Sequence, residues 1–336
     1  MREATTLGIT HANSVAYSAA LTGAALYASA ARGRVWMRDR DRAALLHRLT
    51  TNNIVRLKSG QGTDTVLCTP IGRIIDLLSV YALDDALLLV TSPGRGAALA
   101  SHLRRNIFFK DQVQLEDATA TLGQLTLYGP QAVALLDPLG LPAAALAAHG
   151  IAMTTWHAEP LYVARAPAIG VTGVWLIAPP APLAELGATL HDAGAYPLDA
   201  ATHEVLRVEA GLGAYGHELT PAYIPLETGL WHAVSFTKGC YVGQEIIARM
   251  QSRGRLAKQL QGLRFTEPPA LASAGQAPLA QLEADGKEAG DLTSIVASPR
   301  YGLIGLAYVR KAHAAQGTRL TVAGGEAEVV DLPFKA

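Results

Sequence analysis

Cysteine is scarce in this chain. The 336 residues include only two cysteines, Cys68 and Cys240, which lie far apart in the sequence and have no metal-ligand spacing. Their scarcity argues against a disulfide framework and fits a reducing compartment. We therefore expect a cytoplasmic protein with no stably bound metal.

Charge and long apolar runs are also limited. Charged residues make up 17% of the chain, and 28 Lys plus Arg balance 28 Asp plus Glu. This balance gives no overall attraction to nucleic acid or to an anionic membrane, so we expect neither as a direct partner. Residues 13–31 carry no charge, but they are rich in Ser, Thr, Tyr and Gly, which favours an Ala-rich helix over a membrane span or a signal peptide.

What the chain does have is a hydrophobic content of 50%, enough for sizeable cores, and a length that predicts two or three domains. Strand and helix patterns are interleaved and include a hairpin, which predicts an α+β fold. After a linker at 268–278, short strands with glycine turns predict a small C-terminal β-barrel. The main predicted elements before the linker are strands at 66–69, 74–82, 87–91, 112–116 and 122–127 and helices at 96–105, 131–136 and 183–191.

The densest group of reactive side chains is the segment Lys238-Gly-Cys-Tyr-Val-Gly-Gln-Glu245. Apolar spacing after it predicts a helix, so Cys240 comes just before a helix N-terminus and two residues after Lys238. The helix end and the ammonium both favour a thiolate, which makes Cys240 a candidate for thiol chemistry or cluster contact. Packing of this thiol in a core is the alternative.

Other motifs are less specific. Arg249 and Arg253 share a helix face, which is either a solvated surface or a site for an anionic ligand. Asp76 opens an apolar strand and is either a hairpin-end residue or a carboxylate facing a ligand. Cys68 is expected in a core. The stretch 211–216 matches G-x-G-x-x-G, but prolines follow where a dinucleotide loop needs a helix.

The segment from Lys238 to Glu245 resembles the signature of the YgfZ-type folate-binding proteins. These are relatives of the glycine-cleavage T-protein, an aminomethyltransferase, and they include a mitochondrial iron–sulfur assembly factor. The resemblance runs from about residue 34 to the C-terminus. Further segments that resemble family blocks are 46–54, 68–73, 207–212, 225–227, 298–299, 305–309 and 330–334.

The resemblance implies a three-part, T-protein-like ring around a central folate channel, ending in a small β-barrel. We expect a folate-binding region at 1–258, made of two intertwined α+β subdomains at 1–120 and 121–258. The barrel domain is expected at 259–336.

The implied function is that of a folate-binding accessory protein, with tetrahydrofolate as its cofactor, that assists assembly or repair of iron–sulfur enzymes. Its partners would be folate and, transiently, iron–sulfur proteins or assembly factors, with an indirect effect on tRNA modification. One cysteine cannot hold a stable cluster, which needs about four thiolates. Cys240 is expected to be the working thiol and Lys238 the charge that holds it as thiolate. The expected supporting residues are Gln244 and Glu245 for loop position, Arg249 and Arg253 for the folate tail, and Asp76, Arg207 and Glu209 for the pocket.

Two departures separate this chain from the T-protein enzymes. Those enzymes carry paired acids where this chain has Asp76 and Leu77, and an acid that grips the pterin where this chain has Val174 after Gly173. A missing carboxylate leaves a buried ring donor unpaired, at a cost of about 1–3 kcal/mol. We therefore expect no classical aminomethyltransferase activity. A tetrahydrofolate-dependent aminomethyltransferase or demethylase is the alternative, and a pure scaffold is the third.

Overall fold

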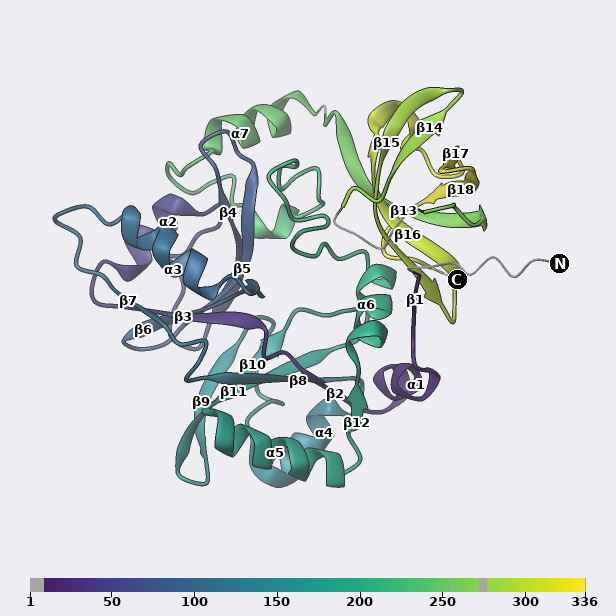
Figure 1. The fold of residues 1–336 in the computed structure, drawn as a ribbon. Coiled ribbons are helices and arrows are strands. Elements are labelled where there is room, and N and C mark those ends of the chain that lie inside the picture. The colour runs from purple at the N-terminus through teal and green to yellow at the C-terminus, as the bar shows by residue number, and fades with distance from the viewer. Residues whose placement is uncertain (1–8, 255, 272–276, 336) are drawn as a thin grey trace.

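The computed structural model describes residues 9–254, 256–271 and 277–335, with the backbone but not the side chain of Arg253. Three β-sheets lie at the corners of a triangle, and long loops connect them (Figure 1). Helices and mostly antiparallel strands alternate along the chain, which confirms the predicted α+β fold and its three parts. Of the predicted linker at 268–278, residues 272–276 lie outside the described ranges.

The first sheet has the strand order β4-β5-β6-β3-β7. Its helices cover one face through apolar side chains such as Leu46 and Leu99. The opposite face packs against the segment 219–234 through Val66 and Ile74. The bounds are β3 (Arg32–Arg38), β4 (Gly62–Cys68), β5 (Ile74–Ala82), β6 (Ala86–Pro93), β7 (Gln114–Asp117), α2 (Arg42–Leu49) and α3 (Gly96–Arg105). The predicted strand 74–82 and helix 96–105 are confirmed.

The second sheet has the order β12-β2-β8-β11-β10-β9. Leu183, Leu186 and Leu190 of one helix pack onto it. The bounds are β2 (Ala25–Ala28), β8 (Gly123–Tyr128), β9 (Ile151–Trp156), β10 (Glu159–Ala166), β11 (Gly173–Ala178), β12 (Tyr196–Leu198), α4 (Ala132–Leu136), η1 (Asp137–Leu139) and α5 (Pro180–Asp192). Because β2 precedes the whole first sheet in sequence, the first two parts of the fold exchange chain segments.

The third sheet closes into the predicted C-terminal barrel. β16 pairs with both β13 and β15, which completes a ring of six strands in the order β15-β14-β17-β18-β13-β16. The short N-terminal strand β1 (Thr10–His11) adds in parallel to β15. The barrel bounds are β13 (Lys258–Glu267), β14 (Ala280–Ala284), β15 (Lys287–Ser298), β16 (Gly302–Arg310), η3 (Lys311–His313), β17 (Arg319–Val322) and β18 (Gly325–Val330).

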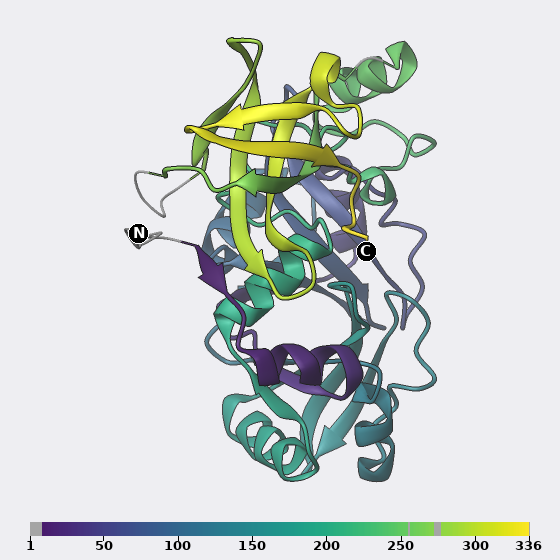
Figure 2. The ribbon, with the colours of Figure 1, turned by 90° about the vertical axis from the view of Figure 1, so that its right-hand side faces the viewer.

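Two helices join the barrel to the second sheet. Figure 2 shows α6 (Ala200–Glu209) between the barrel and α1 (Ser14–Thr22). Asn13 caps α1, and its backbone N–H donates to the Thr202 hydroxyl of α6 at 2.8 Å. The helix predicted within 13–31 is shorter than expected. It ends before Gly23, and the residues that follow form β2, which pairs with β8. Among the described residues, no helix combines the length and apolar character needed to cross a bilayer.

Candidate functional site

The cysteine motif forms a loop that is tied to the C-terminal end of α2. The backbone N–H of Ser235 donates to Thr51 and that of Val242 donates to Arg48, so both ends of the loop are held. Between them, Lys238 is buried and its ammonium donates to three backbone carbonyls. The acceptors are His47 at 2.5 Å, Thr50 at 2.6 Å and Asn52 at 2.7 Å.

These contacts define what Lys238 does in the structure. An ammonium has three donors, and all three are used by the carbonyls, so none remains for the Cys240 sulfur. Burial lowers the pKa of Lys238 to about 7. Its ammonium also lies 4.9 Å from the centre of the Tyr241 ring. Lys238 therefore anchors the loop, and the structure gives it no hydrogen bond to the thiol.

The two cysteines occupy opposite environments. Cys240 is exposed in the loop. Cys68 is buried at the end of β4, as expected for a core residue, and burial raises the pKa of its thiol to about 12. A thiol with such a pKa stays protonated and is not available as a nucleophile. Only Cys240 can therefore meet a partner or a reagent.

The helix predicted after the motif is α7 (Gln244–Arg253). Gly243 precedes it with a left-handed φ of 86°, and a methyl group there would lie 2.8 Å from the Thr69 carbonyl oxygen. Gln244 is half-buried in the first turn, and Glu245 and Arg249 are exposed. None of these three side chains lines either of the two cavities described below. The Arg253 side chain lies outside the described residues.

Arg207 and Glu209 of α6 form hydrogen-bond networks that connect different parts of the fold. The Arg207 guanidinium donates to the carboxylates of Glu204 and Glu218 and to the Ser294 hydroxyl of β15. Burial acts to lower the Arg207 pKa, but the charges of Glu218 and Glu204 outweigh it and raise the pKa above its usual value. Glu218 is itself fully buried. This network fastens α6 to the barrel.

Glu209 forms a second network of this kind. Its carboxylate accepts from the Tyr17 hydroxyl of α1 at 2.8 Å and from the Ser298 hydroxyl of β15 at 2.5 Å. Burial raises the Glu209 pKa, while these two hydrogen bonds act to lower it. The carboxylate oxygens are thus used inside the protein, between α1, α6 and the barrel.

Asp76 and Leu77 point to opposite faces of the first sheet, as neighbours in a strand must. Asp76 pairs with Leu67 on the face covered by α2 and α3, whereas Leu77 packs against the segment 219–234. Asp76 lines a small cavity of about 140 Å³ between β5 and α3. The single acid of this strand therefore faces away from the segment 219–234.

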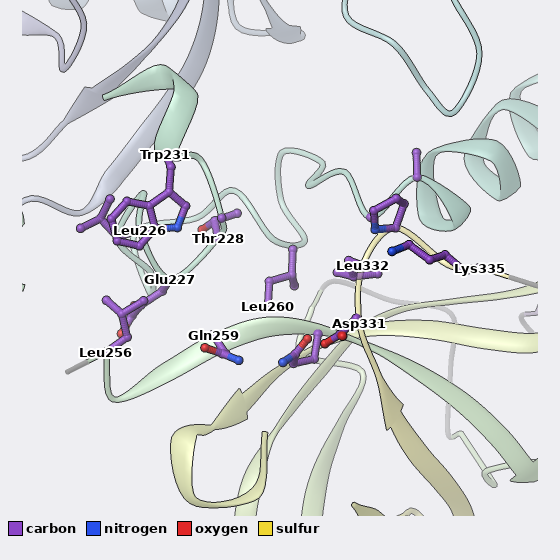
Figure 3. Close-up of a pocket in the computed structure, with 15 residues that line it drawn as sticks. Leu226, Glu227, Thr228, Trp231, Leu256, Gln259, Leu260, Asp331, Leu332 and Lys335 are labelled. Atoms are coloured by element: carbon purple, nitrogen blue, oxygen red, sulfur yellow. The ribbon is translucent and has the colours of Figure 1, made fainter. Parts of the chain in front are cut away.

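A larger pocket of about 540 Å³ opens between the end of α6, the segment 226–231 and the barrel. Figure 3 shows Trp231 and Lys335 on opposite sides of it, with Glu227 below Trp231. Trp231 belongs to the short helix η2 (Trp231–Ala233), and Lys335 belongs to the C-terminal segment. The remaining lining side chains with polar atoms are those of Thr228, Gln259, Gln261 and Asp331.

Glu227 is the buried acid of this pocket. Its carboxylate accepts one backbone N–H, that of Ile224 at 3.2 Å. Burial raises the Glu227 pKa, and the Ile224 N–H and the charges of Lys258 and Arg73 counteract this only in part. The sequence reasoning placed Glu227 in a family block without a role. Its only signal was an acid directly after the apolar pair Pro225-Leu226, and the other pocket residues Trp231 and Lys335 belong to no recognisable motif.

No group of three His, Cys, Asp or Glu side chains within the described ranges is placed to hold a metal ion. The stretch 211–216 forms a loop that opens no helix, which agrees with rejecting a dinucleotide site there.

Two family models match the chain. The GCVT N-terminal domain matches residues 12–238, and the glycine cleavage T-protein C-terminal barrel domain matches residues 258–335. Together they cover both the region that carries the candidate pocket and the barrel.

Proteins with names are similar to this chain over most of its length. The chain is 32% identical to "Putative transferase At1g60990, chloroplastic" from Arabidopsis thaliana, over 90% of this chain and 69% of that one. It is 33% identical to the "Aminomethyltransferase" of Rubrobacter xylanophilus, over 87% of this chain and 78% of that one. Both names describe a transferase. Since one relative is named as chloroplastic, the cytoplasmic location stays a prediction.

A solved structure shares the fold. The glycine cleavage system aminomethyltransferase T from Bartonella henselae superposes with a TM-score of 0.85 at 23% identity, and the match covers 96% of this chain and 89% of that one. At this identity the likeness concerns the fold, including the three-part arrangement and the C-terminal barrel.

Proposed function

Since this chain belongs to the glycine cleavage T-protein family, we propose that it binds tetrahydrofolate in the 540 Å³ pocket and acts as a folate-dependent transferase of one-carbon units. The observation that carries the proposal is the meeting of Glu227, Trp231 and Lys335 in one pocket. Its volume lies in the range of about 300–1,000 Å³ that is usual for small-molecule sites.

The lining suits the three parts of a folate. The ring of a pterin presents N–H donors, and the Glu227 carboxyl has capacity for donors beyond the one N–H that it accepts. The Trp231 ring is 47% exposed and offers a face for stacking. The exposed ammonium of Lys335 suits the carboxylates of a glutamate tail.

Glu227 is also placed to move protons. Tetrahydrofolate supplies the nitrogen atoms that carry a one-carbon unit. A carboxyl whose pKa is raised by burial keeps more of its protonated form near neutral pH than an exposed one, so it can donate as well as accept a proton. The aminomethyltransferase names of the relatives are consistent with this chemistry.

Calorimetry with tetrahydrofolate tests the binding proposal. The wild type should release saturable heat, and Glu227→Gln and Trp231→Ala should each weaken binding about tenfold, which is about 1.4 kcal/mol. Glu283→Gln, an exposed acid on the barrel, is the matched control and should bind like the wild type. No heat at millimolar ligand would remove the proposal. Formation of methylene-tetrahydrofolate from an aminomethyl carrier then tests the transferase activity itself.

A second function, support of iron–sulfur enzymes, is favoured by two observations. Cys240 is exposed on a loop that is tied at both ends, and Leu77 stands on the face toward the segment 219–234 where a second acid would stand in the enzymes. In this function, Cys240 would act on a transiently bound iron–sulfur partner. The effect on tRNA modification would be indirect, through the iron–sulfur enzymes that this protein supports.

One variant separates the two functions. Cys240→Ser keeps nearly the same volume but loses the soft sulfur ligand and nucleophile. Loss of iron–sulfur enzyme activity in cells that carry Cys240→Ser, with unchanged melting, would support the second function. Full activity of the iron–sulfur enzyme in these cells would rule it out, and Glu227→Gln is the reciprocal test for the transferase.

A further inference from the structure

The small cavity between β5 and α3 is a second polar site, separate from the folate pocket. It has a volume of about 140 Å³. Its polar side chains are those of Asp76 in β5, of Arg95, which directly precedes α3, and of His102 and Arg105 in α3. At roughly 30 Å³ for each water-sized group, it holds about four or five non-hydrogen atoms. A folate is far too large to enter it.

The cavity contains buried polar atoms that lack a hydrogen-bond partner within the described part of the chain. Asp76 is 2% exposed. Ser92 and the backbone of Leu77 lie near its carboxyl group, but neither makes a well-aligned hydrogen bond to its oxygens. The buried Nε of Arg95 is also unpartnered. Each such group costs about 1–3 kcal/mol if it stays unpaired, so the cavity favours an occupant with hydrogen-bonding atoms.

The charges around the cavity decide which occupant fits. Burial raises the Asp76 pKa, although Ser92 of β6, the Arg95 charge and the Leu77 backbone act in the opposite direction, so the neutral carboxyl is more populated than in an exposed aspartate. Burial and then the charges of Arg105 and Arg95 lower the His102 pKa, which favours the neutral imidazole. The guanidinium groups of Arg95 and Arg105 supply the positive charge of the cavity. Arg95 is further fixed by stacking 4.6 Å from the centre of the Tyr215 ring.

We propose that this cavity binds a small oxyanion, of the size of formate, bicarbonate or phosphate, between the Asp76 carboxyl and the Arg95 and Arg105 guanidinium groups. Guanidinium forks match the oxygen atoms of carboxylates and phosphates. The Asp76 carboxyl, when protonated, donates to the anion and satisfies one of its own unpaired oxygens. The site depends on neither the folate pocket nor Cys240.

Titration of the full chain with formate, acetate and phosphate tests the proposal by calorimetry and by melting temperature. At least one anion should bind saturably, and the order among the three should report the size and charge that the cavity accepts. Arg95→Gln should weaken binding at least about tenfold. Arg104→Gln is the matched control, because Arg104 lies on the same helix and is exposed and outside the cavity.

Two more variants fix the role of Asp76. Wild-type affinity should fall as the pH rises through the Asp76 pKa, because the ionised carboxylate repels the anion, whereas Asp76→Asn should bind with little pH dependence. Ala98→Leu enlarges an apolar side chain of the cavity wall without removing a charged group and should weaken binding. The proposal is overturned if no anion binds at millimolar concentration. It is also overturned if the melting temperature rises linearly with anion concentration and equally in the wild type and Arg95→Gln. Either result would leave water as the occupant of the cavity.

Discussion

Gly72 and Gly243 lie back to back, so the turn between β4 and β5 packs directly on the start of α7. A methyl group at Gly243 would lie 2.9 Å from Cα of Gly72, and one at Gly72 would lie 3.3 Å from the carbonyl oxygen of Gly243. Both residues have a left-handed φ, 71° and 86°. The contact joins two sequence blocks that are about 170 residues apart, and it fixes where the cysteine loop meets the first sheet.

Gly243→Ala should therefore destabilise the protein by about 1–3 kcal/mol, because the side chain meets backbone atoms and the φ is unfavourable. Gly239→Ala in the same motif is the control, since its methyl group meets nothing within 4 Å. Urea unfolding measures both. Equal stabilities for the two variants would contradict the close contact.

Arg207→Met should cost about 3–5 kcal/mol, because it leaves the fully buried Glu218 carboxylate without its positively charged partner. Arg310→Met removes an exposed pair with Glu288 and should cost at most about 1 kcal/mol. The double variant Arg207→Met with Glu218→Gln should recover part of the loss. If it is less stable than the single variant, Glu218 does not need a positive partner.

Lys238 should make stability depend on pH. Burial lowers its pKa to about 7 in the folded protein, whereas the unfolded chain has a pKa of about 10.4. The folded state binds fewer protons between these values, so the Lys238 contribution to stability rises as the pH increases from about 7 toward 10.4 and is constant below.

The slope is at most about 1.4 kcal/mol per pH unit. Unfolding free energies of the wild type and Lys238→Met, measured from neutral pH to about pH 9, should diverge in favour of the wild type. Lys58→Met, at an exposed position, should run parallel to the wild type. Parallel curves for Lys238→Met would show that its folded pKa is not lowered.

Thiol counting should separate the two cysteines. A thiol reagent should titrate one thiol in the native protein and two in denaturant, because Cys68 is buried with a pKa of about 12 and Cys240 is exposed. Cys240→Ser should leave no fast-reacting thiol and an unchanged melting temperature. Two fast thiols in the native wild type would contradict the burial of Cys68.

The sequence predicted the fold well where local patterns decide it. Alternating apolar residues identified β5, helical spacing identified α3, and glycine turns identified the barrel. It missed β9, β10, β11 and β14. It also extended the N-terminal helix too far, because the pairing of β2 with β8 depends on residues that are about 100 positions apart. Short strands are defined by their neighbours rather than by their own pattern.

The candidate site was predictable only in part. Residue types marked Cys240, and its exposure agrees with a working thiol, a role that stays a proposal. The charge of Lys238 was visible in the sequence, but its three carbonyl partners were not, since they come from the end of a helix almost 190 residues earlier. The sequence likewise grouped Asp76, Arg207 and Glu209 in one pocket, whereas the structure places them in three separate environments.

By itself, the sequence determined the glycine cleavage T-protein family, the α+β class, the barrel and the chemical types that are available: one thiol motif, a single acid in β5 and balanced charge. The tertiary structure alone decided which of these groups meet. Strand alternation turns Asp76 toward α3 and Leu77 toward the segment 219–234, and the packing of the barrel on that segment brings Glu227, Trp231 and Lys335 into one pocket. Local patterns set the direction of a side chain within its own element, whereas its partners depend on which distant elements bury their apolar faces together.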